Sequence, residues 1–416
     1  MVIVKTAPKL RFKDFTDNWK KQKLGKIAKR VSVGIATSSS KYFSSKPNAV
    51  PFIKNQDIKD GTIDLLHLEH ITPDFDRANR NKRVHPGDIL TIRTGYPGKS
   101  AVVPNKLDNA QTFTTLITTL KEENPSFVCN YINSNFGKKQ IIAVQAGGAQ
   151  VNVNANRLKE IIIGLPSLKE QNQIDNLLTA INHIISLQKR KLDNLIKIRK
   201  FYLSKFFPTK RKAEPELRLK KSTNISWKNK KLGEIGKVKS GIGFPTSEQG
   251  GKVGVPFYKV SDMNNKGNEF EMVTANNYVS IDRIKANRWK VIREVPAIFF
   301  AKVGAAVLLN RKRLCRIPFL LDNNTMAYCM DQAILDPIFT KMLFETINLP
   351  SLAQLGALPS YNASDVESLF VYIPTLEEQK KLAKIFQKID NLIVYQQKKI
   401  SLLKQNKEFL LQNLFI

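Results

Sequence analysis

The stretch Leu165-Pro166-Ser167-Leu168-Lys169-Glu170-Gln171 is repeated, with small changes, as Ile373-Pro374-Thr375-Leu376-Glu377-Glu378-Gln379. The offset between the two copies is 208 residues. Each copy opens a run without proline or glycine, from Leu168 to Phe207 and from Leu376 to Ile416. Because proline and glycine end or interrupt helices, these runs predict two long helices. About forty residues at 1.5 Å each make a helical rod of roughly 60 Å.

Both runs carry an apolar seam with alternating steps of four and three residues, which is typical of a coiled coil. The alternative is two unrelated surface helices, each packed on its own domain. A glutamine near the middle of each seam would meet its counterpart in an antiparallel pair, so we expect a Gln188–Gln396 layer that fixes the register. The first seam is Ile174, Leu178, Ile181, Ile185, Gln188, Leu192, Leu195, Arg199 and Tyr202; the second is Leu382, Phe386, Ile389, Ile393, Gln396, Ile400, Leu403, Lys407 and Leu410.

Further segments repeat in the same order, which indicates a duplication with a variable middle. Short β-branched runs between turn signals predict strands ahead of each helix, at 87–92 and 297–301. The fold class that follows is α+β, with two similar mixed α/β domains separated by two long helices that form an antiparallel, pseudo-two-fold coiled coil. The expected domains are 1–165 and 215–373, the helices 166–207 and 374–416, and the linker 208–214. The repeated segments are Pro8–Phe12 and Pro215–Leu219, Trp19–Gly25 and Trp227–Gly233, and Val50–Lys54 and Val255–Lys259.

The chain is strongly basic, with 67 lysines and arginines against 35 aspartates and glutamates and a formal net charge of +32. Such an excess favours a polyanionic partner, although a generally basic composition is the alternative. No apolar run reaches the roughly 18 residues that span a bilayer, so we expect no membrane contact. Three cysteines without CxxC spacing predict no disulfide framework, and we expect a reduced, cytoplasmic protein.

Three motifs resemble catalytic or metal sites, and each is incomplete. Residues 95–100 end like a phosphate-binding loop, but Arg93 stands where its first glycine is required. Residues 124–127 resemble an adenine methyltransferase signature with a wrong third position, and a helix start explains them better. His67 and His70 lack further ligands for zinc. We therefore expect neither a catalytic residue nor a metal site.

Reading DNA requires lysine and arginine for phosphates, and amide, hydroxyl or guanidinium groups for base edges, on loops of a rigid scaffold. Three segments of each repeat fit this description, and the two repeats differ most there. In an alignment of the repeats Gln56 faces Ser261, and Arg93 faces the apolar stretch near residues 299–301. The candidate DNA contacts are Lys54, Asn55, Gln56, Arg93, Thr94, Tyr96, Lys99, Gln150 and Asn152, and then Lys259, Ser261, Asp262, Lys302, Arg311, Lys312, Arg313, Ser360, Tyr361 and Asn362.

This layout resembles that of the specificity subunits of Type I restriction–modification systems over nearly the whole chain. The resemblance rests on the Trp-x-x-x-x-Leu-Gly openings at Trp19 and Trp227, on residues 87–90, on residues 301–305 with 310–313, and above all on the two segments quoted first. One departure is that residues 149–152, Ala-Gln-Val-Asn, stand where the second repeat has Pro-Ser-Tyr-Asn at 359–362.

The resemblance implies a non-catalytic subunit in which each domain reads one half of a split target in double-stranded DNA. It implies partners, namely two modification (methyltransferase) subunits docked through the helices, and restriction (endonuclease) subunits. S-adenosylmethionine, ATP and magnesium would bind those partners, and this chain would hold no cofactor. The apolar helix ends at 201–207 and 410–416 would either dock partners or close the bundle internally. The rival interpretations are a stand-alone DNA methyltransferase or nuclease with unrecognised motifs, and a coiled-coil scaffold with incidental charge.

Overall fold

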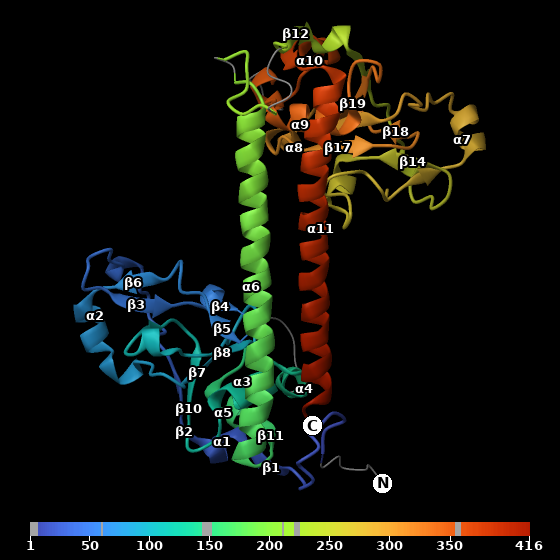
Figure 1. Ribbon diagram of the computed structural model, residues 1–416. Coiled ribbons are helices and arrows are strands. Elements are labelled where there is room, and N and C mark those ends of the chain that lie inside the picture. The colour runs from blue at the N-terminus through green and yellow to red at the C-terminus, as the bar shows by residue number, and fades with distance from the viewer. Residues whose placement is uncertain (1–6, 60, 144–151, 210–211, 220–224, 354–358) are drawn as a thin grey trace. The chain divides into compact units, whose positions relative to one another are not determined.

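The computed structural model describes residues 7–59, 61–143, 152–209, 212–219, 225–353 and 359–416. The chain forms two compact units, of which the first combines residues 1–189 with 398–416 and the second comprises 190–397. Two long helices are unbroken, α6 (Leu168–Phe206) and α11 (Leu376–Asn413), as the sequence predicts (Figure 1). Each unit therefore contains part of both helices. In the described ranges no helix has the length and hydrophobicity needed to cross a lipid bilayer.

The first unit is built on a four-stranded antiparallel sheet in the order β2-β10-β7-β8. Beside it stand a mixed sheet, β6-β3-β9, and two strand pairs, β1-β11 and β4-β5. Its strands are β1 (Lys20–Lys23), β2 (Ala28–Val33), β3 (Val50–Ile53), β4 (Ile58–Lys59), β5 (Thr62–Ile63), β6 (Glu69–Ile71), β7 (Ile89–Thr91), β8 (Ser100–Val102), β9 (Gln111–Thr112), β10 (Leu116–Leu120) and β11 (Ile162–Leu165).

Both faces of the four-stranded sheet are covered, because successive side chains of a strand point to opposite faces. On β7, Ile89 packs in the core that contains Phe127, whereas Leu90 packs in a second core with Ile53. All three residues of β7 are therefore buried, including the polar Thr91. The unit's helices are α1 (Leu24–Ile27), α2 (Pro73–Ala78), α3 (Pro125–Asn133), α4 (Asn135–Ala143) and α5 (Ala155–Lys159), with 3-10 turns η1 (Ser40–Tyr42), η2 (Asn55–Asp57), η3 (Arg80–Lys82) and η4 (Asn105–Leu107).

The second unit repeats this topology, with sheets β13-β19-β16-β17, β15-β14-β18 and β12-β20. Within its described residues, the β4-β5 pair of the first unit has no counterpart. Its strands are β12 (Lys228–Lys231), β13 (Gly236–Ser240), β14 (Val255–Tyr258), β15 (Tyr278–Val279), β16 (Ala297–Ala301), β17 (Lys312–Cys315), β18 (Leu320–Leu321), β19 (Thr325–Met330) and β20 (Phe370–Ile373). Its helices are α7 (Ile281–Ala286), α8 (Ala305–Leu308), α9 (Pro337–Thr346) and α10 (Ala363–Glu367), with 3-10 turns η5 (Leu232–Glu234), η6 (Thr246–Glu248), η7 (Val260–Asn264) and η8 (Leu349–Leu352).

The repeated Glu-Gln pair at the start of each long helix joins that helix to the unit in front of it. In the first unit, buried Glu170 accepts two hydrogen bonds of 2.8 Å from Arg11, and Gln171 Oε1 accepts one from the backbone N–H of Asn124 at the start of α3. In the second unit, Arg218 bonds Glu378, and Gln379 accepts from the backbone N–H of Asp336. The repeated arginines and glutamates of the sequence are therefore partners of each other.

Within each unit the two long helices pack antiparallel. In the second unit Arg199 of α6 pairs with Asp390 of α11, while Phe206, farther along α6, contacts Phe386, which comes earlier in α11. In the first unit, residues 182–189 of α6 face residues 404–411 of α11, and Leu178 shares a core with Leu414. Every predicted seam residue is buried or half-buried, so the seam and the predicted fold class of mixed domains and antiparallel helices are confirmed. Gln188 belongs to one unit and Gln396 to the other, and their layer stays a prediction.

The apolar helix ends mainly close the cores. Of the two interpretations given above, docking of partners and internal closure, the packing of these residues favours internal closure. Phe207 stacks on Phe339 in the second unit at a ring distance of 5.3 Å, and Phe415 packs on Phe127 in the first at 5.4 Å. Both phenylalanines are buried, whereas Phe201 is 54% exposed. The segment at the end of each long helix therefore completes a core.

Candidate nucleic-acid interface

The motifs that resemble enzyme signatures have structural roles. Asn124 caps α3 by accepting a hydrogen bond from the backbone N–H of Phe127, and Asp336 caps α9 in the same way through Ile338 and Phe339. Proline follows each cap at the first helical position, where its missing N–H costs nothing. Residues 124–127 are thus a helix start, as we predict from the sequence.

The glycine-rich segment at 95–100 is the connection between β7 and β8. Gly98 has a φ of +86°, and a Cβ there would lie 2.4 Å from Ile141, so this turn requires glycine for its conformation and for space. His67 lies 3.7 Å from Asp64, and His85 contacts Asp108. Among the residues that the structure describes, no group of three or more histidine, cysteine or acidic side chains is arranged to hold a metal ion.

The first candidate loop has the same geometry in both units. The aspartate three residues after the lysine accepts the lysine's backbone N–H, at 2.8 Å for Lys54 and 2.6 Å for Lys259. Gln56 and Ser261 are exposed at matching places, as the alignment predicts. Lys54 is also paired with Glu69, and Lys259 donates to Gln249. Asn55 is half-buried, and its Oδ1 has no hydrogen-bond partner in the described structure.

The predicted DNA contact by Asp262 is wrong. It is fully buried and accepts backbone hydrogen bonds from Lys259 and Asn276, so its side chain holds the loop together and does not reach a ligand. Burial raises the pKa of this carboxyl, while the two backbone N–H groups act in the opposite direction. The exposed member of this loop is Ser261.

The second candidate segment shows that the sequence alignment is shifted. The carbonyl of Arg93 accepts from the backbone N–H of Val153, and the carbonyl of Lys302 accepts from that of Tyr361. Arg93 therefore corresponds to Lys302 and does not face the apolar residues 299–301, which lie one step earlier on β16. Both matched side chains are basic and half-buried. In the same loop of the first unit, Thr94 and Lys99 are half-buried and Tyr96 is 78% exposed.

The Arg-Lys-Arg triplet at 311–313 does not act as one basic patch. Arg311 donates to Asn264 at 2.6 Å and Arg313 donates to the carbonyl of Asn268, so both lie against the segment that begins with η7. Lys312 points inward, is buried, and donates to Asn310 Oδ1 and the carbonyl of Ile347 at 2.6 and 2.7 Å. The predicted DNA contact by Lys312 is wrong for this reason, since alternate strand positions face opposite sides.

In the third candidate segment the alignment of the two repeats is shifted as well, here by two residues. Asn362 caps α10 and Asn154 caps α5, so these two asparagines correspond, and not Asn362 with Asn152. Asn152 is exposed, while Gln150 lies outside the described residues. Tyr361 is buried and its hydroxyl donates to the carbonyl of Ala301, which gives it a structural role instead of the predicted contact. Ser360 pairs with Val303, next to Lys302.

The structure thus gathers some candidates and separates others. In the first unit Arg93 lies beside the segment of Asn152, and in the second Lys302 lies beside Ser360. Arg311 and Arg313 adjoin the loop that follows Lys259. Each unit consequently displays basic and hydroxyl or amide side chains on loops held by a sheet, which suits contacts to phosphates and base edges.

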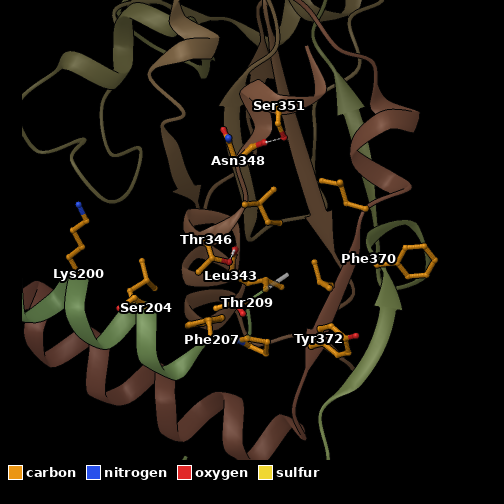
Figure 2. Close-up of a pocket in the computed structure, with 15 residues that line it drawn as sticks. Lys200, Ser204, Phe207, Thr209, Leu343, Thr346, Asn348, Ser351, Phe370 and Tyr372 are labelled. Atoms are coloured by element: carbon orange, nitrogen blue, oxygen red, sulfur yellow. Dashed lines mark hydrogen bonds between the residues drawn. The ribbon is translucent and has the colours of Figure 1, made fainter. Parts of the chain in front are cut away.

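A pocket of about 560 Å³ in the second unit lies between the end of α6, the end of α9 and β20 (Figure 2). Figure 2 shows Phe207, Leu343 and Tyr372 around it, with Lys200 at one side. Lys200 is the one charged residue among its described lining residues. This pocket offers neither a carboxylate pair nor a metal-ligand set, so its chemistry is that of an apolar surface.

Sequence reasoning missed a basic pocket in the first unit, lined by lysines from widely separated segments. Comparing the two long helices at the 208-residue offset gives part of the signal, because Asn182 stands where the second helix has Asp390. The lysines themselves come from separate segments of the chain, and only the tertiary structure brings them together. This pocket has a volume of about 640 Å³ and includes Lys59, Lys99, Lys138, Lys189, Lys404 and Lys407.

Comparison with known proteins identifies a family. Residues 16–197 and 224–405 each match the family described as the Type I restriction modification DNA specificity domain. The chain is 25% identical over 378 residues to the MjaIX Type I restriction enzyme specificity subunit of Methanocaldococcus jannaschii, an alignment that covers 84% of each chain. A shorter alignment, at 26% identity over 129 residues, covers 30% of this chain and 27% of the EcoBI specificity subunit of Escherichia coli.

Solved structures share the fold. The S subunit of a Type I restriction–modification system from M. genitalium superposes with a TM-score of 0.59 at 17% identity, and 99% of each chain is covered. A chain from a study of the assembly and conformational transition of the Type I system gives a TM-score of 0.59 at 18% identity, over 94% of this chain and 96% of that one.

Proposed function

The chain belongs to the family of Type I restriction–modification DNA specificity subunits, and from this premise we propose that it is the sequence-reading, DNA-binding subunit of such a complex. Each unit reads one half of a split target in double-stranded DNA. The formal net charge of +32 supports this role, because neutralising phosphates drives DNA association. A pair of similar domains in one chain suits a target made of two short sequences with an unread gap.

The observation that carries the proposal is that two units of one topology present different side chains at matching loop positions. Gln56 is matched by Ser261, and Arg93 by Lys302. A glutamine amide favours the adenine edge, whereas a serine hydroxyl accepts or donates to either base, so the first pair would read different bases. A shared scaffold with unlike loops therefore supports two unlike half-sites.

We propose that catalysis is carried out by partner subunits. Two modification subunits would transfer methyl groups from S-adenosylmethionine, and restriction subunits would use ATP and magnesium for cleavage, while this chain holds no cofactor. The structural roles found for residues 95–100 and 124–127 support a non-catalytic chain. The relatives support the assembly, since their names describe them as specificity subunits of Type I restriction enzymes.

The test is a map of methylated adenines across the genome in strains with and without the gene. The proposal expects loss of methylation at one split motif, and recovery when the gene is returned. Unchanged methylation would contradict it. Purified chain that transfers methyl groups from S-adenosylmethionine without partners would favour a stand-alone enzyme, and sequence-blind, salt-insensitive DNA binding would favour a scaffold.

A further inference from the structure

Asn55, on the first candidate loop of the first unit, carries an unsatisfied hydrogen-bond acceptor. It is the first residue of η2 and is half-buried, and its side-chain Oδ1 is buried without a hydrogen-bond partner in the described structure. Among the candidate DNA contacts that the structure describes, it is the one with a buried acceptor of this kind. Such an atom costs free energy in the unbound protein, so its presence in a loop calls for a ligand that satisfies it.

The second unit shows that this turn folds without an acceptor at the same position. Lys54 and Lys259 begin the two turns, and each donates its backbone N–H to the aspartate three residues later. Val260, the residue after Lys259, is half-buried like Asn55. An apolar side chain thus occupies the same place on the same backbone. The amide of Asn55 is therefore not needed for the turn to form.

The backbone that carries Asn55 is held on both sides. Buried Asp57 accepts the N–H of Lys54 at 2.8 Å. On the other side, the carbonyl of Ile53 accepts the N–H of Phe113, also at 2.8 Å. A side chain on such a rigid support loses little conformational entropy when it binds, which suits a recognition residue.

The Asn55 turn and the Arg93 loop leave the sheets beside the same short connection. β3 pairs with β9 up to Ile53, two residues before Asn55, and β7 pairs with β10 up to Thr91, two residues before Arg93. Residues 113–115 join β9 to β10. Arg93 is half-buried, and its Nε is buried without a partner in the described structure. Neighbouring loops therefore present an unsatisfied acceptor and an unsatisfied donor, which suits a ligand that has both kinds of group.

The unsatisfied oxygen of Asn55 suits a base and not the DNA backbone. Phosphate oxygens only accept hydrogen bonds, whereas the major groove offers donors at N6 of adenine and N4 of cytosine. Adenine also has the acceptor N7 beside N6, so its amino group can donate to Oδ1 while Nδ2 donates to N7. Because Asn55 is half-buried, a change of side-chain rotamer turns the amide outward, and the missing partner destabilises the inward position.

We propose that Asn55 is an adenine-reading residue of the first unit, which binds N6 and N7 of one adenine in the major groove. The inference rests on the proposed function and names one base within the target. Val260 has no polar side-chain atom and makes neither bond, so the second unit does not read adenine at this position of its turn. The contact thus adds to the difference between the two half-sites.

The test maps methylated adenines in strains that carry wild-type chain, Asn55→Val or Asn55→Asp. Asn55→Val, which introduces the residue of the second unit, should relax the motif at one A·T pair of one half-site and leave the other positions unchanged. Asn55→Asp should move the preference at that pair toward cytosine, because a carboxylate accepts from N4 and donates nothing to N7. The control is Asn105→Val, because Asn105 also begins a 3-10 turn of the first unit, is exposed and is not a candidate contact.

Binding to the purified full-length chain gives the size of the effect. Each base pair of the mapped target is replaced in turn, after thermal melts show that the variants are folded. Wild type should lose roughly 5- to 150-fold in affinity when the A·T pair is replaced, as expected for one bidentate contact. Asn55→Val should bind all four versions of that pair equally and keep the wild-type preferences elsewhere. This pattern also decides the result for a variant that loses methylation altogether.

The outcomes separate the two claims. If wild type gives a split motif and Asn55→Val keeps every base preference, reading by Asn55 is overturned while the proposed function stands. Equal weakening at all positions, relaxation at a G·C pair, or the same effect from Asn105→Val would overturn it as well. A wild-type strain without a methylated split motif would remove the proposed function itself.

Discussion

At the scale of single residues, the two units use matching positions differently. Arg199 and Lys407 occupy equivalent places on the two long helices, but the arginine lies between two carboxylates, whereas the lysine lines a pocket with other lysines. The first arrangement is a buried ionic network and the second is part of a basic pocket. A shared position therefore does not imply a shared role, and each side chain has to be interpreted with its partners.

Replacing Arg199 by methionine should destabilise the second unit by roughly 3–5 kcal/mol, because Glu345 and Asp390 would stay buried with too little positive charge. Lys200→Met, the control on the same helix, should cost much less, since this lysine is exposed. Hydrogen exchange of amides in 190–397 measures the effect. Equal losses for the two variants would show that the network does not stabilise the second unit.

Lys312 predicts a pH dependence of stability. Burial lowers the pKa of its ammonium to about 7, from an ordinary value of 10.5. Below about pH 7 the lysine is protonated in both states, whereas between about 7 and 10.5 the unfolded chain binds the additional proton, so stability rises with pH across this window. The free energy of unfolding, measured for wild type minus Lys312→Met, should therefore increase from pH 7 to pH 10. A flat difference would mean that the buried amine keeps its ordinary pKa.

At the scale of elements, the sequence predicts most where the pattern is local. The long helices follow from proline- and glycine-free runs with an apolar seam, and the start of α3 follows from Asn124-Pro125. The loops are harder, because small insertions shift the alignment of Arg93 and Asn152. Lys312 shows a further limit, since its place on β17 decides that it points inward between two outward arginines. The pocket lysines are separated by up to several hundred residues, and only the tertiary structure brings them together.

The packing of the long helices' ends also predicts which unit a mutation there destabilises. Phe207, at the end of the helix that follows the first domain, packs in the second unit, and Phe415 packs in the first. Phe207→Ala should cost roughly 3–5 kcal/mol and loosen the second unit, and Phe415→Ala should cost about as much and loosen the first. Exposed Phe201→Ala is the control and should change little. Hydrogen exchange resolved by unit is the measurement, and loosening of the unit that precedes the mutated helix would contradict the observed packing.

At the scale of the whole molecule, the duplication gives one chain two DNA-reading units with unlike loops. Each Glu-Gln joint ties a long helix to the unit in front of it, and each helix end completes the core of the other unit. A DNA target made of two different half-sites requires two units that share a topology and carry different loops. The long helices add a second asymmetry among the described residues, because Arg199 of the second unit lies between Glu345 and Asp390, whereas Lys407 of the first unit lines a pocket with other lysines.

The most direct test of two independent half-site readers is an exchange of one of them. Residues 16–160 would be replaced by the matching segment of a specificity subunit with a different target, which leaves the joint at Glu170 and both long helices intact, and methylated adenines would be mapped. The account predicts a new motif in which one half changes and the other half stays as in wild type. A change in both halves, or in neither, would contradict it.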